Sequence, residues 1–276
     1  MMRSPQLQAL KDRYGALPYI TTVVVGIMGL LYCFSLLSSS VTKVLALNPS
    51  AVLHGGIHRL ITYPLVHQDF FHVFFNVFAL VPVLSSFEEE TGTVATVGCL
   101  YFFSVIPGVV YVLTSLLFSS NVVTLGASGW VFSLMAYFAL KDYAVRQTIY
   151  LNQSIQIPTW STPVLTLLLI ALLLPGSSFW GHLYGLLVGY AYGLGYIPVA
   201  RLPAQLVYKV ESTLSQYNLT RALPRFVSDE SASKHRVVID TTVDAGVPSG
   251  GTSPVLAPVG GVGRSAFNGQ GRPLGV

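Results

Sequence analysis

Charged residues are scarce in this chain, and their scarcity indicates its class. Only 9% of the 276 residues are charged, whereas 52% are hydrophobic, and soluble domains carry about 25% charged residues. A deficit of this size is typical of a chain that is surrounded by lipid over much of its length. The formal net charge of +4 is too diluted to indicate nucleic-acid binding. We therefore expect an integral membrane protein in contact with the lipid bilayer.

Cysteine is almost as rare, with Cys33 and Cys99 as the two examples. Both lie inside apolar runs, which excludes a disulfide framework and a cysteine-based metal site. His54, His58 and His67 cluster after the first apolar run, but their spacing matches no closed set of zinc ligands. We therefore expect buried apolar packing for the cysteines, a solvated or structural role for these histidines, and no metal or other cofactor.

Long apolar runs, in contrast, are abundant. A membrane-spanning helix needs about 20 predominantly apolar residues, and the first run is too long for the core of a cleaved signal peptide. Six candidate spans follow one another: Leu17–Leu37, Phe70–Phe87, Val94–Phe118, Ser128–Leu140, Ile155–Leu174 and Phe179–Ala200. All should be helical, because an open sheet cannot satisfy its backbone in lipid. The sequence therefore predicts an all-α bundle of six membrane helices over residues 17–200.

The fourth candidate span is unusually short. Its thirteen residues extend only about 20 Å as a helix, so we expect this central helix to begin or end well inside the bilayer. Irregular backbone at that depth is tolerated only against protein or beside a water-filled cavity. The short helix therefore predicts a hydrated recess in the bundle.

The basic residues predict the orientation and the ends of the chain. If residues 1–16 are cytosolic, 13 of the 15 Lys and Arg residues lie on the cytosolic side and only Lys43 and Arg59 lie opposite, as the positive-inside rule requires. Six spans then place both termini in the cytosol. Residues 201–217 have helical apolar spacing, which predicts an amphipathic helix along the membrane surface. Residues 218–276 are rich in Ser, Gly, Pro and Val, and we expect a disordered cytosolic tail.

A serine begins the fourth span, within Gly126-Ala127-Ser128-Gly129. A serine at a helix N-terminus can cap the helix or pack against a neighbour, and for this tetrapeptide alone that interpretation is favoured. Alternatively, its hydroxyl can act on a substrate while nearby backbone N–H groups face developing negative charge. Polar groups inside spans are costly, and each is therefore a functional hypothesis.

His182 lies four residues into the sixth span; taken alone, it is better interpreted as an interfacial residue bonded to a carbonyl than as a catalytic base. Glycine recurs at every fourth position of this helix, at Gly181, Gly185, Gly189 and Gly193. Small residues on one face let two backbones approach closely, and the fourth span offers a matching face in Gly129, Ser133 and Ala136. If these faces meet, Ser128 and His182 lie near the same end, as a nucleophile and its general base must.

His72 and Asn76 are four residues apart and share one face of the second span. Both side chains can donate hydrogen bonds to the oxyanion of a tetrahedral intermediate; a structural hydrogen bond between helices is the alternative. No Asp or Glu lies in the core of a candidate span. The predicted catalytic unit is therefore a Ser–His dyad rather than a triad with a carboxylate.

Together these motifs resemble the rhomboid family of intramembrane serine proteases. The resemblance covers most of residues 17–200 and rests on GASG at 126–129 followed by Trp-Val-Phe, HVFFN at 72–76, the acidic turn ending at Gly92, and GHLYGLLVG at 181–189. It implies hydrolysis of transmembrane segments near their luminal end, with Ser128 as nucleophile, His182 as base, and His72 with Asn76 at the oxyanion. Gly126, Gly129, Gly181, Gly185 and Gly189 would pack around this site. One departure is His58-Arg59, where the family often has Trp-Arg, so the fine structure of the first loop is not predicted.

The six-span core and the long tail are most similar to fungal Golgi rhomboids. That resemblance implies a Golgi membrane location, with the endoplasmic reticulum as the alternative, and suggests membrane-bound transcription factors among the substrates. In the tail, Phe267, Gly269, Gly271 and Leu274 resemble the short SHP-type motif F-x-G-x-G-x-x-L. This motif binds the N-domain of an AAA ATPase of the valosin-containing-protein type; a chance match in a glycine-rich tail is the alternative.

Two functions therefore remain open. The first is a rhomboid serine endopeptidase that cleaves transmembrane protein substrates. The second is a catalytically inactive, derlin-like adaptor that delivers membrane clients to the ATPase through the tail. An adaptor does not need both Ser128 and His182, so their joint presence favours the protease. A transporter or channel is disfavoured, because the sequence shows no internal repeat and no charge within a span.

Overall fold

The computed structural model describes residues 17–152, 154–174 and 176–234 of the chain. Its elements in chain order are α2 (Tyr19–Leu37), α3 (Ser40–Leu45), α4 (Pro49–Leu53), α5 (Arg59–Thr62), η1 (Tyr63–Leu65), α6 (Phe70–Thr91), α7 (Thr93–Leu117), α8 (Ser128–Val145), β1 (Thr148–Tyr150), β2 (Gln156–Pro158), η2 (Thr159–Ser161), α9 (Thr162–Leu173), α10 (Phe179–Gly193), η3 (Pro198–Ala200), α11 (Ala204–Gln216), α12 (Leu219–Ala222) and α13 (Asp229–Ser233). The sheet of the described part is the antiparallel hairpin of β1 and β2, in which Ile149 pairs with Ile157. The predicted N-terminal segment 1–16 and the SHP-type motif at 267–274 lie outside the described residues.

The first three predicted spans are confirmed as long apolar helices. In the described chain, α2, α6 and α7 are long and apolar enough to cross a membrane. A fourth candidate is the pair of α10 and residues 198–216, which is bent by 89°. Leu37, Phe78 and Leu117 on the three long helices are strongly exposed, as side chains in contact with lipid would be. The described chain is therefore a helical membrane bundle, although not all six expected spans have full length.

The fourth helix is longer than expected. It begins at the predicted residue but continues past Leu140 to Val145, so that α8 has 18 residues. The added turn is stabilised because the Lys141 ammonium forms an ion pair with the Glu90 carboxylate of α6, which also accepts a hydrogen bond from the Tyr137 hydroxyl. A paired and hydrogen-bonded charge is tolerated where an isolated one is not. The prediction of a short central helix is therefore wrong, and α9, with 12 residues, is shorter.

The fifth and sixth helices also differ from the prediction at their ends. The expected span from Ile155 begins instead as β2 and η2, and α9 starts only at Thr162. Pro163 lies in its first turn, where proline is favoured. The helix of the sixth span ends at Gly193 rather than at residue 200. Gly195 follows with φ of +82°, a backbone conformation that favours glycine, and the chain then turns into η3 and α11.

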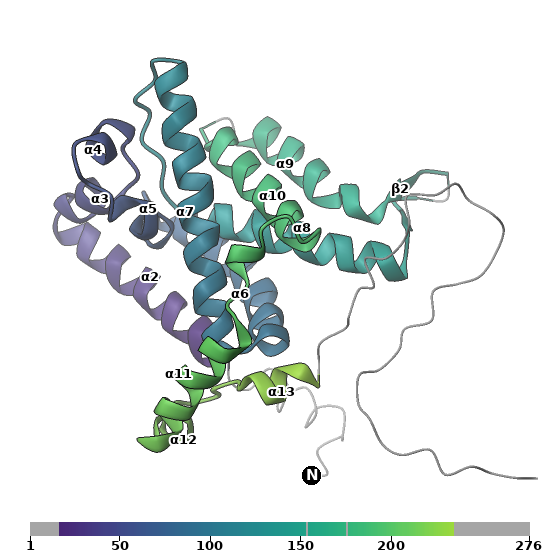
Figure 1. Cartoon of the computed structure of the whole chain (residues 1–276). Helices are drawn as coiled ribbons and strands as arrows, with labels where there is room; N and C mark the ends of the chain where they lie inside the picture. The colour runs from purple at the N-terminus through teal and green to yellow at the C-terminus, as the bar shows by residue number, and fades with distance from the viewer. Residues whose placement is uncertain (1–16, 153, 175, 235–276) are drawn as a thin grey trace, which may run out of the picture.

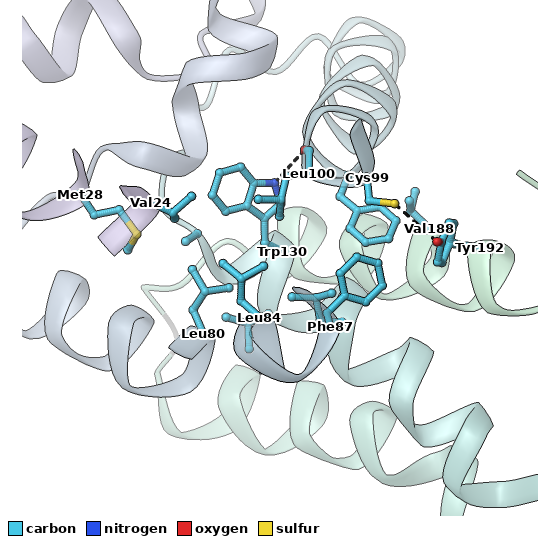
Figure 2. Packing of buried hydrophobic residues seen from close by; sticks show 14 of the residues in the cluster. Val24, Met28, Leu80, Leu84, Phe87, Cys99, Leu100, Trp130, Val188 and Tyr192 are labelled. Carbon is cyan, nitrogen blue, oxygen red and sulfur yellow. Dashed lines mark hydrogen bonds between the residues drawn. The ribbon is translucent and has the colours of Figure 1, made fainter. Parts of the chain in front are cut away.

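The main core lies where α2, α6, α7, α8 and α10 meet (Figure 2). Trp130 of α8 lies at its centre and donates from Nε1 to Ser104 Oγ at 2.9 Å and to Leu100 O at 3.2 Å. Cys99 is buried in this core, with its sulfur 3.4 Å from the Tyr192 hydroxyl oxygen. The expected burial is therefore confirmed for Cys99, whereas Cys33 of α2 is exposed. The tight core fixes α8 against its neighbours.

A second correction concerns the C-terminal segment. Residues 218–234 were expected to belong to a disordered tail, but they fold back on the bundle where α6 ends and α7 begins (Figure 1). The Thr93 N–H group donates to Val227 O at 2.8 Å, and the Tyr19 N–H group donates to Arg225 O at 3.2 Å. The physical reason is that the first N–H groups of a helix lack intrahelical acceptors, which this segment supplies to α7 and α2. We call residues 223–233 the C-terminal clasp; its Ala232 side chain is fully buried.

Candidate active site

Helices α8 and α10 lie side by side and touch through their small residues (Figure 1). A Cβ atom on Gly185 would lie 2.9 Å from Gly129 Cα, and one on Gly189 would lie 2.6 Å from Ser133 Cα. Such close backbone approach requires small residues at the interface. The Ser133 hydroxyl also donates across it to Gly185 O at 2.8 Å. The two faces that were expected to meet are therefore in backbone contact.

Ser128 is the first residue of α8 and is half-buried. Ala127 is the N-cap residue of this helix, which has no side-chain cap. Among the described residues, the Ser128 hydroxyl forms no hydrogen bond, so the capping role left open by the sequence is not observed. The N–H groups of Ser128 and Gly129 are in the first turn, where a helix offers no acceptor and its dipole favours negative charge. The hydroxyl is therefore free beside backbone donors.

His182 packs on the same face of α8 as the serine. Ser128 and Phe132 are four residues apart and share this face, and the centroid of the Phe132 ring is 4.9 Å from that of His182. His182 is only 6% exposed, and its Nδ1 atom has no hydrogen-bond partner within the described chain. No hydrogen bond joins Ser128 to His182 there either, as is common before a substrate binds. The structure thus brings the two residues to one end of the interface between α8 and α10.

A glycine turn brings His72 next to the start of α8. Gly126 has φ of +105°, and a Cβ atom on it would lie 2.6 Å from His72 Nε2, so glycine is required here for both backbone conformation and space. The Gly126 N–H group donates to Tyr63 O at 2.9 Å. His72 Nδ1 accepts a long hydrogen bond of 3.5 Å from the Gln68 N–H group, which assigns the proton of a neutral ring to Nε2. His72 therefore presents an N–H donor beside Gly126, two residues before Ser128.

Asn76 lies one turn further along α6 and is buried. Its Nδ2 atom donates to His72 O at 2.7 Å, and its Oδ1 atom has no partner in the described part of the chain. An amide carries two N–H protons, so this bond leaves one of them unused. Asn76 therefore makes a hydrogen bond within its own helix, rather than the bond between helices that the sequence left as the alternative.

No carboxylate of the described residues forms a hydrogen bond or ion pair with His182. Asp69, just before α6, accepts a hydrogen bond from the His72 N–H group at 2.9 Å and caps that helix. Glu90 is held by Lys141 and Tyr137. No group of three or more His, Cys, Asp or Glu side chains in the described chain is placed to hold a metal ion. The groups around Ser128 are thus an imidazole and N–H donors, which suit nucleophilic catalysis by a hydroxyl.

Comparison with known proteins shows the family of this chain. A family model described as the Rhomboid domain matches residues 54–199. The chain belongs to the rhomboid family. Rhomboid-type serine protease 2 of Neurospora crassa is 36% identical over 248 residues, which cover 86% of this chain and 88% of that protein. Rhomboid-type serine protease B of Aspergillus fumigatus is 35% identical over 76% of this chain and 75% of its own length. Rhomboid-type serine protease 2 of Saccharomyces cerevisiae is 34% identical over 78% of this chain and 83% of its own.

The site of this rhomboid contains one residue that the sequence did not assign to it. His67 is 1% exposed, and its Nε2 atom accepts a hydrogen bond from the Ala127 N–H group at 3.3 Å. Its ring meets that of His72 edge to face, with 5.0 Å between centroids. His54 and His58 instead contact the carbonyl oxygens of Ser50 in α4 and Val44 in α3, and both are exposed. The sequence offers one signal that His67, rather than His54 or His58, lies at the site: His67 is only five residues before His72, which is in the first turn of α6.

Proposed function

We propose that this rhomboid is an intramembrane serine protease that cleaves transmembrane segments of other membrane proteins with a Ser128–His182 dyad. One observation carries the proposal: the backbone contact of α8 with α10 brings both side chains to the same end of one interface. Membership of the rhomboid family and its similarity to rhomboid-type serine proteases support a membrane-embedded hydrolase. The free serine hydroxyl at the start of α8 supports a nucleophile rather than a helix cap.

The proposed reaction is acyl transfer to Ser128. His182 takes the hydroxyl proton as the oxygen attacks the scissile carbonyl, and later gives that proton to the leaving amine. The oxyanion is stabilised by the His72 Nε2–H group, the second amide proton of Asn76 and backbone N–H groups of the first turn of α8. Water, deprotonated by His182, then hydrolyses the acyl-enzyme and restores the serine. Packing against Phe132, rather than a carboxylate, orients the imidazole.

A fluorophosphonate probe tests the nucleophile without a known substrate. We expect the purified protein to be labelled, and Ser128→Ala and His182→Ala to lose the label, because the reaction needs an activated serine. Ser120→Ala, in the loop that leads to α8, is the matched control and should label like the wild type. Equal labelling of wild type and Ser128→Ala would refute the assignment of Ser128.

A reporter with one transmembrane segment separates the protease from the derlin-like adaptor. In proteoliposomes, we expect the wild type to cut the reporter and Ser128→Ala to bind it without cutting, with at least about a 10³-fold loss of rate. An adaptor would bind the reporter equally in both forms and cut it in neither. Cleavage that survives Ser128→Ala would contradict the proposed dyad.

The proposal extends to the tail and the location. Phe267 and Leu274 are apolar anchors separated by Gly269 and Gly271, a spacing that lets an extended backbone lie close to the N-domain of an AAA ATPase. Deleting residues 265–276 should abolish co-purification of the ATPase and spare cleavage of the reporter; retained co-purification would eliminate this motif. A Golgi location is expected from similarity to fungal Golgi rhomboids. Imaging of tagged protein against Golgi and endoplasmic reticulum markers distinguishes the two membranes.

A further inference from the structure

The turn before Ser128 is held by two hydrogen bonds from the segment that precedes α6. Tyr63 O accepts from the Gly126 N–H group at 2.9 Å, and His67 Nε2 accepts from the Ala127 N–H group at 3.3 Å. The His67 ring is buried, and its Cδ2 atom is 3.7 Å from the position that a Cβ atom would take on Gly126. This imidazole therefore lies against the backbone immediately before the proposed nucleophile.

Because His67 Nε2 accepts from the Ala127 N–H group, it affects which backbone N–H groups before and in α8 stay free. Ala127 is the N-cap of α8, and its carbonyl accepts from the Val131 N–H group at 3.1 Å. His67 occupies the Ala127 N–H group, so that the next backbone donor along the chain is Ser128 itself. The edge of the His67 ring also packs against His72, whose Nε2 atom faces Gly126. His67 thus contacts both the backbone and the side-chain part of the proposed oxyanion site.

We infer that His67 is a positioning residue of the protease, which uses its Nε2 lone pair to hold the turn that carries Ser128 and thereby directs the Ser128 N–H group and His72 to the oxyanion. This inference rests on the proposed function of Ser128. A buried N–H group without an acceptor is unfavourable, so removal of the lone pair releases the turn even when the space is filled.

The ring can hold this role over the whole working pH range. Burial, with a smaller contribution from His72, lowers the pKa of His67 to about 3, although the Leu65 backbone and, to a smaller extent, Asp69 act in the opposite direction. The imidazole is therefore neutral at neutral pH, and its lone pair is available. It follows that the acidic limb of the activity profile does not come from His67.

Three substitutions of His67 separate the lone pair from packing. Glutamine can place an acceptor near the position of Nε2, asparagine places one nearer Nδ1, and leucine fills space without any acceptor. We expect His67→Gln to keep more than about half of wild-type kcat, and His67→Leu and His67→Asn to lose at least about tenfold. KM for the reporter should stay close to that of the wild type, and the thermal midpoints of the Leu and Asn variants should fall by about the same few degrees, because in both the Ala127 N–H group loses its acceptor. His54→Leu, in the same loop region but away from the site, should be unaffected.

The outcomes distinguish this inference from the proposed function. Normal kcat in His67→Leu, or equal loss in the Gln and Leu variants, would overturn the positioning role. If His67→Leu does not fold, kcat of the Gln and Asn variants is compared instead, and an equal loss in both would overturn the positioning role. His67→Gln should retain the acidic limb of the wild-type pH profile. Fluorophosphonate labelling of Ser128→Ala is measured alongside, and a positive result there would overturn the proposed function itself, whichever of the His67 variants is active.

Discussion

Single glycines set the distance between α8 and α10, the two helices that carry the proposed dyad. A Cβ atom on Gly185 or Gly189 would meet backbone atoms of α8, which cannot move aside as a flexible side chain can. Gly26 and Gly29 of α2, in contrast, have no atom within 4 Å of such a position. All four residues are glycines inside helices, but only Gly185 and Gly189 are in backbone contact with another helix. Alanine substitution should therefore affect the two pairs differently.

We expect Gly189→Ala to lower the free energy of unfolding by about 1–3 kcal/mol, because overpacking forces the helices apart. Labelling of Ser128 should fall with it, since this contact brings the two residues of the proposed dyad together. Gly29→Ala is the matched control and should be neutral or stabilise by up to about 1 kcal/mol, because glycine weakens a helix interior. Thermal unfolding in detergent measures both variants. Equal stability and labelling of Gly189→Ala and the wild type would show that the contact is not tight.

The neighbouring glutamates at the end of α6 offer a second matched pair. Glu88 is fully buried and accepts from the N–H groups of Ile20 and Thr21 at 2.9 and 2.8 Å, and from the Thr93 hydroxyl at 2.8 Å. Its carboxylate therefore satisfies the first turn of α2. Glu89 is more exposed and pairs with Arg225 at 3.1 Å.

We predict that Glu88→Gln lowers the free energy of unfolding by about 1.5–3 kcal/mol, because hydrogen bonds to a charged acceptor are lost and an amide NH₂ faces donors. Glu89→Gln should cost no more than about 1 kcal/mol, as is usual for exposed ion pairs. The difference is read from thermal unfolding of both variants in the same detergent. A smaller loss for Glu88 than for Glu89 would contradict the role of Glu88 as a helix anchor.

The sequence indicates residues whose partners follow a pattern, and it misses those whose partners are distant. Ser128 and His182 could be paired in advance because both belong to helices with matching small-residue faces. His67 and Glu88 could not, because their partners, Ala127 and Thr21, lie 60 and 67 residues away. Acceptors for the free N–H groups of a helix can come from any segment that folds nearby, and periodicity does not encode which one.

At the scale of elements, helix starts are easier to predict than helix ends. α6, α8 and α10 begin at the expected residues, each just after a polar or small residue. The ends of α8 and α10 depend on an ion pair with another helix and on a glycine turn, respectively. The fold of the C-terminal clasp was missed for a similar reason, because its composition is polar and its contacts are backbone hydrogen bonds to other elements.

Two truncations test the C-terminal clasp. A chain that ends at residue 234 keeps the hydrogen bonds to Tyr19 and Thr93, whereas a chain that ends at residue 222 loses them and the burial of Ala232. We expect the shorter chain to lose about 2–4 kcal/mol of the free energy of unfolding, from the lost hydrogen bonds and the apolar contacts of α13. The longer chain should unfold like the full-length protein. Equal thermal midpoints for the two truncations would show that the clasp contributes nothing.

At the scale of the whole molecule, the proposed catalytic site and the C-terminal clasp lie at opposite ends of the bundle. α8 connects these ends: Ser128 begins it, and Lys141 near its C-terminal end binds Glu90, close to the turn between α6 and α7. Its 18 residues extend about 27 Å. If the basic residues set the orientation, the clasp faces the cytosol and the loops before α6 face the lumen.

Natural glycosylation sequons provide a test of this orientation. Asn152-Gln153-Ser154 lies between β1 and β2, and Asn218-Leu219-Thr220 lies between α11 and α12. Both fall on the side predicted to be cytosolic, where the acceptor sequence N-x-S/T is not modified, so we expect the protein expressed in yeast to carry no glycan. The double substitution Gly55→Asn with Ile57→Thr places a sequon in the loop predicted to be luminal, at exposed positions. Gly55 has φ of +98°, and asparagine is among the residues that tolerate a positive φ best. This variant should show an endoglycosidase-sensitive shift in mobility on a gel. A glycan on the wild type, at Asn152 or Asn218, would reverse the predicted orientation and place the C-terminal clasp in the lumen.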